Sequence, residues 1–225
     1  MAKRPNTNSA ETILVIGLGR FGTSVASSLI RMGHEVLGVD ENLQRVQEMA
    51  DRLTHVLQAD TTNPEALRQL GIGDFKTAVI AIGSDMEASI LTALALIEAG
   101  LPRIWAKATN ERHGKILKSI GVQNVVYPEA RMGQMVAHIL TGKMMDYVEL
   151  DNDFAMVKTR APSRLVGQSL EQARVRQRDG VTIVGVKRLG KVFTYAQANT
   201  VVEQDDLLIV LGEVALVEKF AAGID

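Results

Sequence analysis

The sequence contains no cysteine, which excludes disulfide bonds, thiolate nucleophiles and cysteine-based metal sites. It also contains no run that approaches the ~18 consecutive apolar residues of a membrane-spanning helix. Neither sign of charge dominates, because 25 Lys and Arg residues are balanced by 26 Asp and Glu residues and the net charge is −1. The chain as a whole therefore exerts no strong attraction on nucleic acid, and we expect no nucleic-acid partner.

The first residues, 1–11, are polar and lack the apolar core of a signal peptide. We expect them to form a disordered tail, and we expect the protein to be cytoplasmic. Any work at a membrane would then require another chain that spans the bilayer. The rest of the sequence can form hydrophobic cores, because 46% of all residues are hydrophobic.

Short apolar runs alternate with segments of helical periodicity between residues 12 and 126. The runs that we interpret as strands are 12–16, 35–39, 55–58, 77–82, 103–107 and 124–126. The helices expected between them are 21–32, 43–53, 64–70, 87–98 and 112–120. Strands joined by helical crossovers predict an α/β fold, a Rossmann-like doubly wound parallel sheet.

The pattern changes after Pro128. Residues 130–145 are expected to form one long methionine-rich helix, which packs on the sheet or forms a subunit interface. Extended segments dominate beyond it, at 155–158, 182–187, 192–194 and 207–211. We therefore expect two domains: residues 12–145, which end in the long helix, and residues 146–225, a small α+β domain of regulatory or dimerising type.

Residues 17–22 read Gly-Leu-Gly-Arg-Phe-Gly, a GxGxxG motif between a strand and a helix. Gly17 permits the tight turn, Gly19 lets a phosphate approach the backbone, and Gly22 lets the helix lie close to the sheet. Asp40 ends the next strand, 21 residues beyond Gly19, where a carboxylate can accept ribose hydroxyls. Its acidity argues against a 2′-phosphate and hence against NADP. The alternative is a turn without a ligand, with Asp40 as a helix cap.

Arg20 lies beside this loop, and a guanidinium there can bind a further phosphate in bidentate fashion. A triphosphate would use this contact, whereas a dinucleotide does not need it; the alternative is a surface arginine. The loop lacks the Gly-Lys-Ser/Thr ending of a P-loop. We recognise no nucleophile or general base at a catalytic spacing, so the sequence does not predict an enzyme.

Residues 16–22 and 32–40 together resemble the RCK (KTN) domain family, nucleotide-binding regulators of potassium conductance that include the cytosolic subunits of Trk and Ktr uptake systems. The resemblance continues at 81–85, 104–108, 120–121 and 127–129, and it covers the chain from residue 11 to residue 212. The second half resembles the RCK_C domain, so the first would be the RCK_N domain. This resemblance implies a cytosolic subunit that gates a separate membrane-spanning potassium channel or transporter subunit in response to ATP and ADP.

The resemblance also implies an assembly and a set of site residues. Members form homodimers that assemble into an octameric ring at the inner face of the membrane. By position, the phosphates would be held by Gly17, Gly19 and Gly22, with Phe21 in the same loop and Lys107 nearby, and Arg20 would contact a γ-phosphate across the dimer. The ribose would be bound by Asp40, the adenine would be flanked by Asp60 and Thr61, and the far wall of the site would be formed by Ile82, Gly83 and Ser84. A divalent or monovalent cation would be bound by Glu129. Asp60 could instead cap the following helix, and Glu129 could favour the dipole of its own helix.

Two other functions use the same loop. The glycine motif and Asp40 also fit an NAD-dependent dehydrogenase or an NAD(H)-sensing regulator, including a free-standing redox-sensing transcription regulator. Some members of the family bind cyclic di-AMP in the second domain. Glu171 replaces an aliphatic residue of that pocket and Tyr195 replaces a proline, so we do not expect cyclic di-AMP binding here.

Overall fold

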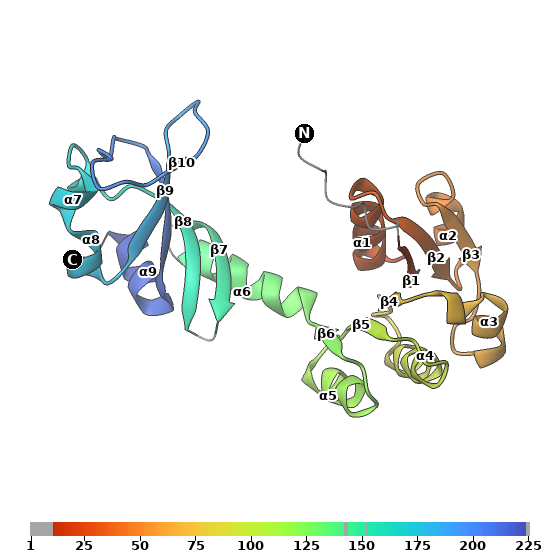
Figure 1. Cartoon of the computed structure of the whole chain (residues 1–225). Coiled ribbons are helices and arrows are strands. Elements are labelled where there is room, and N and C mark those ends of the chain that lie inside the picture. Colours follow the sequence, from red (N-terminus) through yellow and green to blue (C-terminus); the bar gives the residue numbers. More distant parts are fainter. Residues whose placement is uncertain (1–10, 142–143, 152, 224–225) are drawn as a thin grey trace, which may run out of the picture. The chain divides into compact units, whose positions relative to one another are not determined.

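A computed structural model describes residues 11–141, 144–151 and 153–223. Residues 1–10, which belong to the predicted disordered tail, lie outside the described residues. The chain forms two compact units that divide between Glu129 and Ala130 (Figure 1). This division lies inside a helix, and the functional domain boundary after residue 145 stays a prediction.

The first unit is built on one parallel sheet with the strand order β3-β2-β1-β4-β5-β6. Its strands are β1 Thr12–Ile16, β2 Glu35–Asp40, β3 His55–Gln58, β4 Thr77–Ile80, β5 Arg103–Lys107 and β6 Asn124–Val126. The order of the strands reverses between β1 and β4, and doubly wound sheets bind their ligands at such a point. The predicted Rossmann-like fold is confirmed for this unit.

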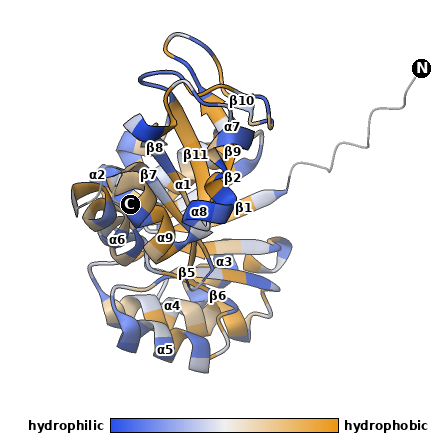
Figure 2. Cartoon of the chain, turned by 90° about the vertical axis from the view of Figure 1, so that its left-hand side faces the viewer, coloured by the Kyte–Doolittle hydropathy of each residue, from blue (hydrophilic) through white to orange (hydrophobic). Residues whose placement is uncertain are grey.

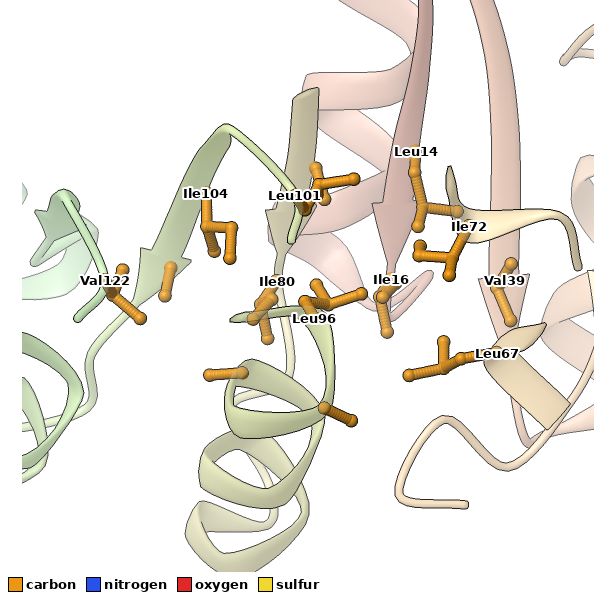
Figure 3. Packing of buried hydrophobic residues seen from close by; sticks show 14 of the residues in the cluster. Leu14, Ile16, Val39, Leu67, Ile72, Ile80, Leu96, Leu101, Ile104 and Val122 are labelled. Carbon is orange, nitrogen blue, oxygen red and sulfur yellow. The ribbon is translucent and has the colours of Figure 1, made fainter. Parts of the chain in front are cut away.

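Helices cover both faces of the parallel sheet. They are α1 Arg20–Arg31, α2 Leu43–Met49, α3 Pro64–Gln69, α4 Met86–Glu98 and α5 Glu111–Ser119, with a 3-10 turn, η1, at Ile72–Asp74. Because side chains alternate along a strand, Val15 packs with residues of α1 and α2, whereas Ile16 packs with residues of α3, α4 and α5. Figure 3 shows this second cluster, in which Leu96 of α4 packs with Ile16 and Ile80 of the sheet.

Polar side chains cap most of these helices. The caps of α2, α3, α4 and α5 accept a hydrogen bond from a backbone N–H and are Asn42, Asn63, Asp85 and Asn110. In α1 the capping position is Gly19, and within the described chain no side chain accepts from the first N–H groups. These groups remain available at the edge of the sheet where β1 ends.

The second unit contains an antiparallel sheet with the order β10-β9-β11-β8-β7. Helix α6, Pro128–Thr141, leads into it, and its other elements are β7 Met144–Asp151, β8 Phe154–Arg160, η2 Ser163–Leu165, α7 Leu170–Ala173, α8 Val175–Asp179, β9 Thr182–Lys187, β10 Thr194–Tyr195, β11 Leu207–Glu213 and α9 Val214–Ala222. Figure 2 shows the central strand β11 as hydrophobic and the surface helix α8 as hydrophilic. This unit confirms the predicted small α+β fold.

The predicted helix over residues 130–145 is wrong at its end. Helix α6 ends at Thr141, and Met144 begins β7 instead. Met144 pairs with Thr159 of β8 and is only 4% exposed. Its apolar side chain continues the helical pattern of the sequence, but pairing with β8 determines its conformation.

Other elements also differ from the prediction. The strand expected at 192–194 is wrong at both ends, because β10 begins at Thr194 and ends at Tyr195. Strand β4 ends at Ile80 rather than at residue 82, because the chain turns there to pass close to Gly17. Helix α2 ends at Met49 rather than at residue 53, and α9 was not predicted because its apolar sequence follows β11 without a turn signal. In the part of the chain that the structure describes, no helix is long and apolar enough to cross a membrane.

Candidate nucleotide-binding site

The residues predicted for the site follow or end the strands of the parallel sheet. Gly17, Gly19, Arg20, Phe21 and Gly22 follow β1, Asp40 ends β2, Asp60 and Thr61 follow β3, Ile82, Gly83 and Ser84 follow β4, Lys107 ends β5, and Glu129 follows β6. Parallel strands bring all these positions to one edge of the sheet, the edge at which doubly wound folds bind ligands. The role of each residue in binding stays a prediction.

The three glycines of the loop have different structural constraints. Gly17 has a φ of +91°, which side chains disfavour, and a Cβ there would lie 3.0 Å from the backbone of Ala81. A Cβ on Gly22 would lie 1.8 Å from the carbonyl oxygen of Gly17, so α1 can approach the sheet only with glycine at this position. A Cβ on Gly19 would meet no atom within 4 Å. The fold thus requires Gly17 and Gly22, whereas Gly19 leaves open space beside the uncapped start of α1.

Asp40 is buried and ties the glycine loop to the end of β2. Its Oδ2 accepts a 2.6 Å hydrogen bond from the backbone N–H of Leu18, and its Oδ1 accepts one of 2.8 Å from the N–H of Asn42. The guanidinium of Arg45 lies 3.4 Å from Oδ2. Asn42, not Asp40, provides the side-chain cap of α2. The sequence did not predict that Leu18 and Arg45 would contact Asp40. For Arg45, the only sequence signal was a basic residue in the first turn of the helix that follows the carboxylate.

Lys107 reaches from β5 toward the glycine loop. Its ammonium lies 5.9 Å from the centre of the Phe21 ring, and its side chain is only 12% exposed. A Cβ on Gly83 would lie 2.8 Å from Nζ, so glycine at this position leaves room for the lysine. The ammonium donates a 2.5 Å hydrogen bond to Oε1 of Glu129. The structure thus brings Phe21, Gly83, Lys107 and Glu129 together.

Glu129 lies in the first turn of α6, and its side chain is 67% exposed. The hydrogen bond from Lys107 holds the pKa of Glu129 below its usual range, and the nearby charge of Arg20 acts in the same direction. The side chain of Arg20 is exposed and makes no hydrogen bond or ion pair with another described residue, whereas its backbone carbonyl accepts a hydrogen bond from the hydroxyl of Thr23. No group of three potential metal ligands occurs among the described residues, so a cation at Glu129 stays a prediction and would need further ligands.

Asp60 and Thr61 lie side by side in sequence but have different surroundings. The exposed Asp60 accepts hydrogen bonds from both the hydroxyl and the backbone N–H of Thr62, which lower its pKa. The alternative that Asp60 caps α3 is wrong, because Asn63 is the cap. Thr61 is buried, and its hydroxyl lies 2.9 Å from that of Thr92 on α4. Sequence analysis missed Thr92, whose signal was a polar residue within an apolar helix.

Comparison with known proteins identifies the family of each unit. The TrkA-N domain model matches residues 13–128, and the TrkA-C domain model matches residues 154–223. Ktr system potassium uptake protein C of Bacillus subtilis is 39% identical over 207 residues, which are 92% of this chain and 94% of that protein. Ktr system potassium uptake protein A of Vibrio alginolyticus is 36% identical over 88% of this chain and 90% of that protein.

Solved structures show the same fold at lower sequence identity. The GsuK RCK domain superposes with a TM-score of 0.67 at 18% identity and covers 98% of this chain and 50% of the other. The GsuK channel bound to NAD has a TM-score of 0.67 at 17% identity and covers 96% of this chain and 40% of the other. The two matched domain models, together with the fold, define a protein of the RCK class. Within this class, the chain belongs to the TrkA-N/TrkA-C family of Ktr and Trk potassium uptake proteins.

Proposed function

We propose that this chain is a cytosolic subunit that senses adenine nucleotides and gates a separate membrane-spanning potassium channel or transporter. The observation that carries the proposal is the open space at Gly19 beside the uncapped N-terminus of α1. Backbone N–H groups and the helix dipole favour a phosphate at such a position. The relatives are potassium uptake proteins, which supports a membrane transporter as the partner.

Asp40 is suited to hold the ribose even though it already binds the loop. A carboxylate offers about four lone-pair directions, and Leu18, Asn42 and Arg45 use three of them. One direction remains for a ribose hydroxyl. A 2′-phosphate would meet the negative charge of Asp40, which disfavours NADP.

The competing ligand is NAD(H), because a glycine loop followed by an acidic residue also binds dinucleotides in Rossmann-like folds. Two related folds were solved with other ligands, GsuK with ADP and a Kef C-terminal domain with AMP. The exposed side chain of Arg20, which has no ionic partner among the described residues, favours a ligand with an additional terminal phosphate, which ATP has and NAD lacks. We propose no catalytic reaction, since the sequence shows no nucleophile or general base at a recognisable catalytic spacing.

The proposal extends to assembly. We propose that homodimers form an octameric ring that binds its membrane partner from the cytoplasmic side, and that Glu129 contributes to a cation site between bound nucleotides. The apolar side chains exposed on α6, which include Met132 and Val136, support an interface on this helix. Light scattering with and without ATP measures the size of the assembly, and a monomer under both conditions would contradict it.

Substitution of Gly19 by alanine tests the phosphate site without disturbing the fold. The added Cβ meets only open space in the protein, but it would occupy the approach of a phosphate. We expect Gly19→Ala to melt at the temperature of the wild type without nucleotide and to lose binding of ATP and ADP in calorimetric titrations. Gly73→Ala, in the 3-10 turn η1, is the matched control because its Cβ also meets open space. Equal nucleotide binding by both variants and the wild type would refute the proposed site.

A flux assay tests the regulatory role. Vesicles that contain a Ktr-type membrane subunit should take up potassium in a nucleotide-dependent way when this chain is added. Gly19→Ala should bind the vesicles but remove the response to nucleotide. A response that persists in this variant would place the control elsewhere.

A further inference from the structure

We infer that the carboxylate of Glu129 competes with the nucleotide's phosphate for Lys107, so that binding of a polyphosphate breaks the ion pair between β5 and the first turn of α6. The inference rests on the proposed function, because it describes how the same site is regulated. It is based on the 2.5 Å contact between the two side chains and on their different burial, because the side chain of Lys107 is largely buried and that of Glu129 is largely exposed.

Lys107 is the more buried partner in this ion pair. Its side chain is 12% exposed and lies between Gly83 and the ring of Phe21. A largely buried ammonium requires a counter-charge, since removal from water disfavours an unpaired ion. Lys107 therefore stays at the glycine loop and holds whichever anion is best placed to pair with it.

Glu129 is the exposed partner in this ion pair. Its side chain is 67% exposed, and Lys107 is the ionic partner that the described chain provides for it. A glutamate in the first turn of a helix remains favoured by the helix dipole when it loses an ion pair. The carboxylate can thus leave Lys107 for solvent at small cost, whereas Lys107 cannot follow it.

A phosphate at the start of α1 would approach the same ammonium from the side of the glycine loop. Phosphate oxygens carry more charge than a carboxylate and form stronger charge-assisted hydrogen bonds with ammonium groups. Arg20 adds a second cation on this side, near enough for its charge to lower the pKa of Glu129. A polyphosphate between Arg20 and Lys107 would displace Glu129 from the ammonium. The competing ligands are therefore nucleoside di- and triphosphates, and a nucleoside without phosphate leaves the pair intact.

Calorimetric titrations in EDTA, which removes divalent cations, test the competition. We expect Glu129→Gln to bind ATP and ADP about threefold to fivefold more tightly than the wild type, the range expected for one partly exposed ion pair. Adenosine should bind both proteins equally. Glu111→Gln is the matched control: it removes an exposed carboxylate from the first turn of α5 without touching Lys107, and it should leave all affinities unchanged. In a Lys107→Gln background, Glu129→Gln should have no further effect.

A second readout follows the carboxylate directly. In the wild type, the pKa of Glu129 measured by carbon-13 NMR should lie below its usual range without nucleotide and should rise when ATP is added. Equal or weaker ATP binding by Glu129→Gln, or a pKa of Glu129 that stays low with ATP bound, would overturn the inference. Failure of the wild type and all variants to bind ATP would refute the proposed function itself, and the competition with it.

Discussion

The backbone N–H of Leu18 and the carboxylate of Asp40 are joined by a 2.6 Å hydrogen bond across 22 positions of sequence. Leu18 is 2% exposed and Asp40 5%, so neither group can turn to water if the other is removed. The carboxylate therefore holds the glycine loop in place before it can contribute to ligand binding. Stability and nucleotide affinity should consequently depend on the same side chain.

Asp40→Ala should lower both quantities. Loss of the acceptor leaves the N–H of Leu18 buried without a partner, which costs about 1–3 kcal/mol in the free energy of unfolding. Binding of ATP and ADP should weaken to a similar extent for both, because the ribose is common to them. Urea denaturation and calorimetric titration measure the two effects. Wild-type stability with weakened binding would show that the carboxylate serves only the ligand.

Gly22→Ala should disrupt the fold, in contrast to Gly19→Ala. The added Cβ would overlap the carbonyl oxygen of Gly17, so α1 must move away from the sheet. Overpacking of this kind costs about 1–3 kcal/mol or more. Thermal unfolding followed by circular dichroism should show a lower midpoint for Gly22→Ala and little change for Gly73→Ala. Similar midpoints for the two variants would contradict the close packing.

Arg20→Ala should weaken ATP binding selectively. A guanidinium that pairs with the terminal phosphate contributes about 1.5–3 kcal/mol through charge-assisted hydrogen bonds, and ADP lacks this phosphate. ADP affinity should therefore change little. Arg112→Ala, an exposed arginine at the start of α5, is the control. An equal loss for both nucleotides would mean that Arg20 shapes the loop rather than reading the γ-phosphate.

Acid should remove the stabilising effect of Glu11. Hydrogen bonds from Arg103 and Thr77 lower the pKa of Glu11 from 4.5 in the folded protein, with Arg103 the larger cause. Because the folded pKa is depressed, the ion pair stabilises the fold above pH 4.5 and this stability is lost as the pH falls through the folded pKa. Glu11→Gln should thus be less stable than the wild type at pH 7, by less than about 1 kcal/mol. The difference should diminish in urea titrations as the pH falls below 4.5; a constant difference would contradict the assignment.

Sequence patterns predicted the parallel sheet because each of its strands is a short apolar run between turn residues. They failed at Met144, whose apolar side chain fits the period of α6 as well as that of β7, and only pairing with β8 decides between them. The glycine loop and Asp40 were found because strand, motif and acidic residue follow each other at fixed spacing. The contact between Lys107 and Glu129 could not be derived in this way, because it depends on how β5 and the start of α6 are placed in space.

The glycines of the loop are subject to two different evolutionary constraints, one from the fold and one from the binding of a phosphate. Mutations at Gly17 or Gly22 would be removed whether or not the protein binds a ligand, because the backbone cannot accommodate a side chain there. Mutations at Gly19 would be removed only while a phosphate must approach the loop. In a lineage that had lost its nucleotide, the outer glycines would persist and the middle one would drift. Among the three glycines, the middle one is therefore the position at which a survey of genomes can distinguish sensors from chains that retain only the fold.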